Sequence, residues 1–149
     1  MENNNLSEFD RIAAQCLCTN VRKASRMITK LYDDFLQPSG LLTTQFIVLG
    51  AISAQPEIAL TPLADKLGMD PTTLARNLKP LERDGLIEVA KGVDRRTRVL
   101  KITEQGMASI AKAYPYWKQA HTWMISHLGE ERSQVMIQDW SDLVALASK

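Results

Sequence analysis

The segment Thr61–Thr103 constrains the fold of this 149-residue chain more than any other stretch. It holds two closely spaced helix-start signals, Thr61-Pro62 and Asp70-Pro71. An oxygen-bearing side chain before a proline is typical of a helix N-terminus, because the oxygen caps free N–H groups and proline has no N–H to leave unpaired. Gly68 and Gly85 favour a stop after each apolar stripe. The segment therefore predicts two short helices joined by a tight turn.

Two strands should follow these helices. Residues 86–89 and 98–102 partly alternate between apolar and polar side chains, as half-buried strands do, and residues 58–60 could add a third edge. Residues 76–101 hold eight Lys or Arg side chains against four acids, a local charge of +4 in a chain of net charge +1. The expected fold class is mainly α, a winged helix-turn-helix with a small antiparallel β wing. Its second helix would enter the DNA major groove.

Candidate DNA contacts follow from that arrangement. Arg76 should lie on the free face of the second helix, where arginine can hold guanine O6 and N7 in bidentate fashion. Arg95 and Arg96 at the wing tip could enter the minor groove or contact phosphate, whereas Asp94 would brace the wing. The full candidate set is Thr61, Thr72, Thr73, Arg76, Asn77, Lys79, Lys91, Asp94, Arg95, Arg96 and Arg98. The alternative is that these side chains form only a solvated surface.

Several short motifs of this segment occur together in one known family. They are Leu63-Ala64, Leu67, Arg76, Leu81-Glu82, Gly85-Leu86, Asp94-Arg95-Arg96 and Leu100-x-x-Thr103-x-x-Gly106. With them the chain resembles the MarR family of bacterial transcriptional regulators over nearly its whole length. The resemblance implies a homodimeric DNA-binding protein, a repressor whose affinity for a pseudo-palindromic operator is modulated by a small ligand. It also implies that Asp94 pairs with one wing arginine.

Apolar stripes with helical spacing flank this segment on both sides, at residues 21–35 and 107–128. A winged helix needs only part of a chain this long, so we expect dimerisation helices at 7–36 and 104–147. They would surround a DNA-binding unit at 44–103 within one domain of residues 1–149. The alternative is that the stripes pack within one chain. About six helices are expected, the first continuous from residue 7 to residue 36, with bends at Pro80 and Pro115.

Both cysteines, Cys16 and Cys18, lie in the first expected helix. The sequence around them is similar to the first helix of the OhrR group, the organic-peroxide sensors of the MarR family. By that resemblance Cys18 stands at the reactive cysteine, and Tyr32 at a tyrosine that hydrogen-bonds it. Arg22, one turn away, could favour the thiolate form. Oxidant sensing is therefore an alternative mode of regulation; the other interpretation is that both cysteines are small packing side chains.

Other classes of function find less support in the sequence. No apolar run approaches the roughly 18 residues of a membrane span, and no leader is evident, so a cytoplasmic location with reduced cysteines is expected. Two histidines without a supporting cluster make no metal site, and no cofactor motif is present. Trp117 and nearby aromatic side chains could instead hold an aromatic effector. A small thiol oxidoreductase and a winged helix that binds only protein remain as rivals.

Overall fold

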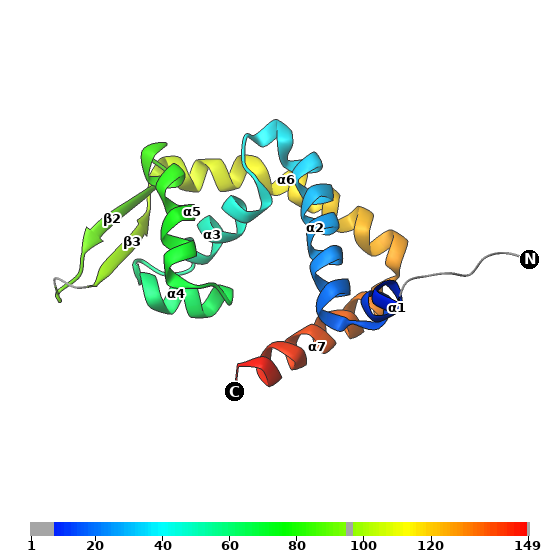
Figure 1. Cartoon of the computed structure of the whole chain (residues 1–149). Coiled ribbons are helices and arrows are strands. Elements are labelled where there is room, and N and C mark those ends of the chain that lie inside the picture. The colour runs from blue at the N-terminus through cyan, green and yellow to red at the C-terminus, as the bar shows by residue number, and fades with distance from the viewer. Residues whose placement is uncertain (1–7, 95–96, 149) are drawn as a thin grey trace, which may run out of the picture.

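A computed structural model describes residues 8–94 and 97–148 of the chain (Figure 1). In Figure 1 the wing, α4 and α5 lie at one end, α1 and α7 lie at the other, and α6 runs between the two ends. The helices are α1 (Glu8–Gln15), α2 (Leu17–Leu36), a 3-10 turn (Gln37–Ser39), α3 (Thr43–Ser53), α4 (Leu60–Leu67), α5 (Pro71–Arg83), α6 (Glu104–Leu128) and α7 (Glu130–Ala147). The strands are β1 (Ile58–Ala59), β2 (Ile87–Lys91) and β3 (Arg98–Ile102).

The three strands form one antiparallel sheet in the order β1-β3-β2. Leu100 of β3 stands opposite Ile58 on one side and Val89 on the other, and Leu100 is fully buried. The third edge anticipated at residues 58–60 is therefore present, although it is only two residues long. The mainly helical winged fold is confirmed.

One apolar core joins α3, α4, α5 and the sheet to the first half of α6. Its fully buried large side chains are Leu36, Leu49, Ile52, Leu63, Leu74, Leu81 and Leu100. Leu74 and Leu81 belong to the apolar stripe of α5, and Leu78 of the same stripe is also buried. Packing of this kind, more than helix propensity, stabilises helices as short as α4 and α5.

The start of α6 explains the Thr-x-x-Gly motif in physical terms. The hydroxyl of Thr103 donates to the carbonyl oxygen of Gly85 at 2.7 Å and accepts from the backbone N–H of Gly106 at 3.0 Å. A Cβ on Gly106 would collide with the carbonyl oxygen of Leu86, so only glycine fits there. The motif thus joins the end of α5 to the first turn of α6.

Three expectations about helix boundaries were wrong. The first helix is not continuous, because Cys16 adopts an extended conformation and separates α1 from α2, which makes seven α-helices in the described residues. The amide of Asn20 donates to the carbonyl oxygens of Ala13, Ala14 and Cys16 and so satisfies the end of α1. Thr61 is not an N-cap, since α4 already begins at Leu60, directly after β1. α3 spans Thr43–Ser53, whereas its sequence pattern predicts a helix at about residues 44–54.

Both internal prolines lie inside helices that continue past them, Pro80 in α5 and Pro115 in α6. Within residues 8–94 and 97–148 no single helix is long and apolar enough to cross a membrane. Leu17–Ser39 and Thr43–Ser53 meet the length and composition only as a pair bent by 76°.

Candidate nucleic-acid interface

Helix α5 presents one polar face to the outside because the opposite face is anchored in the core. Oδ1 of Asp70 accepts the backbone N–H groups of Thr72 at 2.9 Å and Thr73 at 3.1 Å, which caps the helix as the Asp-Pro signal predicts. The side chains of the outer face are all exposed, namely Thr72, Thr73, Arg76, Asn77 and Lys79. Five of the candidate DNA contacts are thereby brought onto one helix.

Salt bridges distinguish two groups among the cations of this region. Arg83 binds Asp84 at 2.9 Å, and Lys101 binds Glu57 at 3.1 Å. The hydrogen bond between Arg83 and Asp84 raises the pKa of the guanidinium and lowers that of the carboxyl. The cations proposed to meet DNA form no salt bridge among the described residues; they are Arg76, Lys79, Lys91 and Arg98. Their charge is therefore available to phosphate.

The wing turn is closed by two backbone–backbone hydrogen bonds and one from a side chain. The N–H of Gly92 donates to the carbonyl of Thr97 at 2.8 Å. The backbone N–H and the hydroxyl of Thr97 both donate to the carbonyl of Asp94, at 2.9 and 2.7 Å. Arg95 and Arg96 lie outside the described residues, so their contacts with DNA and the brace from Asp94 stay predictions. Thr61 is exposed in the first turn of α4 and does not cap that helix.

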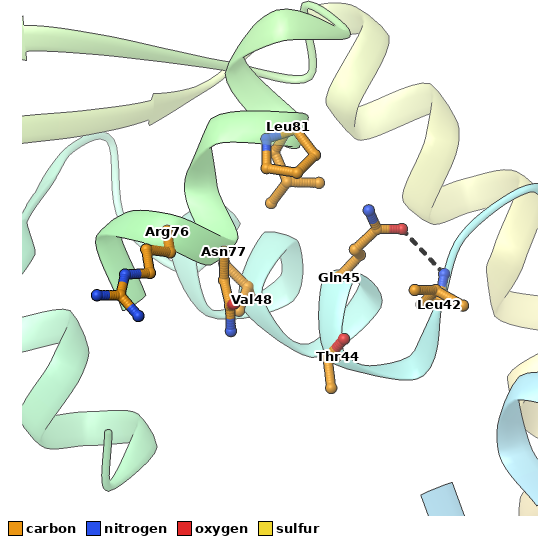
Figure 2. Close-up of a pocket in the computed structure, with 8 residues that line it drawn as sticks. Leu42, Thr44, Gln45, Val48, Arg76, Asn77 and Leu81 are labelled. Atoms are coloured by element: carbon orange, nitrogen blue, oxygen red, sulfur yellow. Dashed lines mark hydrogen bonds between the residues drawn. The ribbon is translucent and has the colours of Figure 1, made fainter. Parts of the chain in front are cut away.

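A hollow of about 170 Å³ lies between α5 and the first turn of α3 (Figure 2). Arg76 and Asn77 of α5 line it together with Thr44 and Gln45 of α3. Oε1 of Gln45 accepts the backbone N–H of Leu42 at 3.0 Å, which fixes the side chain at the helix start. The sequence did not predict that Thr44 and Gln45 would lie beside the candidate DNA contacts Arg76 and Asn77. The only local signal is a glutamine at the third helical position, a common partner in helix capping.

The two cysteines occupy different environments, and both are free thiols. Cys18 is exposed on α2, whereas Cys16 is half-buried at the N-cap of that helix. Hydrogen bonds from the side chain and backbone of Thr19 lower the pKa of Cys16 below its usual value. Cys16 is therefore a second candidate for a reactive thiol beside Cys18.

Tyr32 does not contact Cys18 within one chain. It lies fourteen residues further along the same helix, about 21 Å at 1.5 Å per residue. Its hydroxyl instead lies 3.5 Å from Nδ1 of His121 in α6, and burial raises the pKa of the phenol. The ring of His121 stacks on Trp117 at 5.0 Å, and Trp117 stacks on Phe46 of α3 at 6.1 Å. Aromatic contacts thus link α3 to α6. Among the described residues no group of three His, Cys, Asp or Glu is placed to hold a metal ion.

Comparison with known proteins adds an independent line of evidence. A MarR-family sequence profile matches residues 39–97. The HTH-type transcriptional regulator SarZ of Staphylococcus epidermidis is 33% identical over 91 residues, 60% of this chain and 62% of SarZ. The aligned part thus spans less than two thirds of that relative.

Solved structures cover more of the chain. The transcriptional regulator MosR of M. tuberculosis, solved in complex with DNA, is 34% identical over 89% of this chain and 98% of MosR, with a TM-score of 0.80. A mutant MarR from E. coli complexed with operator DNA has the same fold, with a TM-score of 0.81 at 21% identity over 93% of this chain and 99% of that one. SarZ and MosR are both transcriptional regulators, which speaks against an enzyme such as a thiol oxidoreductase. The chain belongs to the MarR family of winged-helix transcriptional regulators.

Proposed function

We propose that this protein controls transcription in the cytoplasm as a homodimer that binds a pseudo-palindromic duplex operator, and that bound protein represses. One observation carries the proposal: the polar, capped face of α5 stands free beside cations that have no acidic partner among the described residues. Arginine and asparagine on such a face can recognise guanine and adenine edges. Lys79, Lys91 and Arg98 would add contacts to phosphate. Support also comes from MosR, which was solved with DNA.

The terminal helices support the dimer. Large apolar side chains are exposed along α1, the first half of α2 and α7, including Phe9, Leu17, Trp140 and Val144. Apolar patches of this extent on a regulator are typical of an interface. A second copy would cover them and place two α5 helices about one turn of duplex apart, ~10 bp or a multiple of it.

A small aromatic effector is the proposed modulator of DNA affinity. The stacked rings of Phe46, Trp117 and His121 connect the DNA-facing half of the chain to α6. A ligand that binds one arrangement of these rings better than another would shift the separation of the two α5 helices. Affinity for the operator would change without any change in the base-contacting residues.

The proposal is tested by selecting bound sequences from random duplexes and then measuring affinity for the selected operator. Arg76→Ala should weaken binding by about 1–3 kcal/mol and relax the preference at one base position. Arg83→Ala is the matched control, because Arg83 lies on the same helix but is bound to Asp84. Equal loss on all sequences would remove Arg76 from base recognition. Failure of the wild type to prefer any duplex would overturn the function itself.

A second candidate mode, oxidant sensing, is favoured by the lowered pKa of Cys16. The hydrogen bonds from Thr19 stabilise the thiolate, which is the form that oxidants attack. Peroxide should release operator DNA from the wild type and less from Cys16→Ser or Cys18→Ser, with the larger protection identifying the sensing thiol. Equal release from all three proteins would leave both cysteines as packing residues.

A further inference from the structure

The junction between α2 and α3 has an unusual cap. The N-cap residue of α3 is Leu42, whose side chain has no oxygen to accept a hydrogen bond. The backbone N–H of Thr43 is donated instead to Oδ1 of Asp33, a residue of α2, at 2.6 Å. A carboxylate at a helix N-terminus satisfies a free donor and complements the helix dipole. Asp33 therefore satisfies, from another helix, one of the N–H groups that α3 itself leaves unpaired at its start.

The neighbouring residue adds a second connection. Tyr32 meets His121 of α6, so two consecutive residues of α2 contact α6 and α3 respectively. The covalent link between α2 and α3 is short, residues 37–42, and includes Gly40 with φ of 85°. Without the Asp33 contact this link would leave the angle between α2 and α3 less constrained.

The orientation of α3, which Asp33 helps to fix, determines the position of the DNA-facing helix α5. Gln45 and Val48 of α3 line the same hollow as Arg76 and Asn77 of α5 (Figure 2). Val48 and Leu49 are buried in the core that holds α5. A rotation of α3 about its first turn would therefore move α5 with it, since packed elements move as rigid bodies.

We propose that Asp33 is a positioning residue for DNA binding: it fixes the angle between the dimerisation helices and the DNA-binding unit, and so the half-site spacing that the dimer accepts. The inference rests on the proposed function. Each base pair inserted between half-sites turns the second one by about 35° around the duplex axis. A rigid junction rejects that rotation, whereas a loosened junction follows it.

The test compares the selected operator with a version that has one extra base pair between its half-sites. The wild type should lose about tenfold or more in affinity on the longer spacer, a penalty comparable to a mismatched base pair. Asp33→Ala should lose only about threefold, because the freed angle adapts at the cost of ordering it on binding. Asp33→Asn should fall between them, since its amide oxygen still accepts the N–H of Thr43.

A double variant separates positioning from capping. Asp33→Ala with Leu42→Ser gives α3 a local cap on the N–H of Thr44 or Gln45, which should recover much of the thermal stability lost in Asp33→Ala. The tolerance for the longer spacer should nevertheless stay broad, because serine at position 42 does not connect α3 to α2. If Leu42→Ser also restores the spacer penalty, Asp33 is only a cap and the proposal is overturned.

Thr43→Val is the matched control. The Thr43 hydroxyl is buried and has no hydrogen-bond partner among the described residues, whereas its backbone N–H makes the contact with Asp33. The spacer penalty of Thr43→Val should therefore equal that of the wild type; a loosened preference would contradict the assignment. A wild type that discriminates spacers while Asp33→Ala discriminates equally defeats this inference alone. A wild type that binds no duplex defeats the proposed function with it.

Discussion

The winged-helix unit (α3 to β3, residues 43–102) buries most of its large apolar side chains, whereas the terminal helices (α1, α2, α6 and α7) leave many of theirs exposed. All but one of the seven fully buried large side chains belong to the winged-helix unit. By contrast α1 has no buried residue and α7 buries only Ser133. Burial of apolar area is the main favourable contribution to folding. One half of the protein is thus stabilised within a single chain, whereas the other half exposes the apolar surface on which the proposed dimer depends.

The largest expected effect is a loss of stability caused by a cavity in the core of the winged-helix unit. Leu74 of α5 is fully buried, so Leu74→Ala should lower the free energy of unfolding by about 2–5 kcal/mol through lost burial and a residual cavity. Urea unfolding followed by circular dichroism measures it. Val144→Ala on α7 is the control from the other half, 63% exposed in the single chain. A loss at Val144 as large as that at Leu74, measured at a concentration where the protein is monomeric, would erase the contrast.

The second largest effect is expected at the start of α6, where the terminal helices join the winged-helix unit. Gly106→Ala puts a Cβ against the carbonyl oxygen of Leu86, a rigid backbone atom that cannot move aside without shifting the end of α5. We expect about 1–3 kcal/mol of destabilisation, as for other overpacked sites. Thermal unfolding measures it. Gly50→Ala is the comparison, because a Cβ there meets nothing within 4 Å. Equal stability of Gly106→Ala and the wild type would mean that this joint is not tight.

A charge placed on the exposed apolar surface of α7 tests whether that surface forms the proposed dimer interface. Val144→Glu should raise the dissociation constant of the proposed dimer by about tenfold or more, because an unpaired carboxylate would be buried at the interface. Sedimentation equilibrium gives the constant. Val93→Glu is the matched control, since Val93 is fully exposed at the wing and belongs to the other half. Dimerisation that ignores Val144→Glu, or responds equally to Val93→Glu, would place the interface elsewhere.

The sequence predicted the winged-helix unit better than the terminal helices. The reason is that the helix-start and burial patterns of the winged-helix unit involve residues that are close together in the sequence. Asp70-Pro71 starts α5, and Thr103 with Gly106 starts α6, through contacts that span only a few residues of each helix start. The buried face of α5 repeats at helical spacing because that face meets one core. Such features depend on residues that are close together in the sequence, and the exposed polar side chains of α5 follow from them directly.

The predictions that failed concern helix boundaries and neighbours that are determined by contacts with distant parts of the sequence. The break at Cys16 has neither glycine nor proline; an amide at Asn20 satisfies the carbonyls that end α1. α4 begins before Thr61 because β1 pairs with β3, forty residues further along, and brings the chain to the helix start. Thr44 and Gln45 reach the hollow beside Arg76 and Asn77 only through the packing of α3 against α5. No local pattern could have shown that Asp33 caps α3.

The smallest expected effect concerns a chemical difference between the halves, since both cysteines lie in the terminal helices. The hydrogen bond from the Thr19 side chain makes the largest contribution to the lowered pKa of Cys16. Thr19→Val should therefore move that pKa up toward the ordinary value of 9.0. In a Cys18→Ser background only Cys16 reacts, and the pH profile of iodoacetamide alkylation should shift to higher pH. At pH 7.5 the rate should fall by about two- to fivefold, because the thiolate is the nucleophile. Thr19→Ser keeps the hydroxyl and should keep the wild-type profile. A profile that Thr19→Val leaves in place would show that the hydroxyl does not stabilise the thiolate, and the case for Cys16 over Cys18 as the sensing thiol would fall with it.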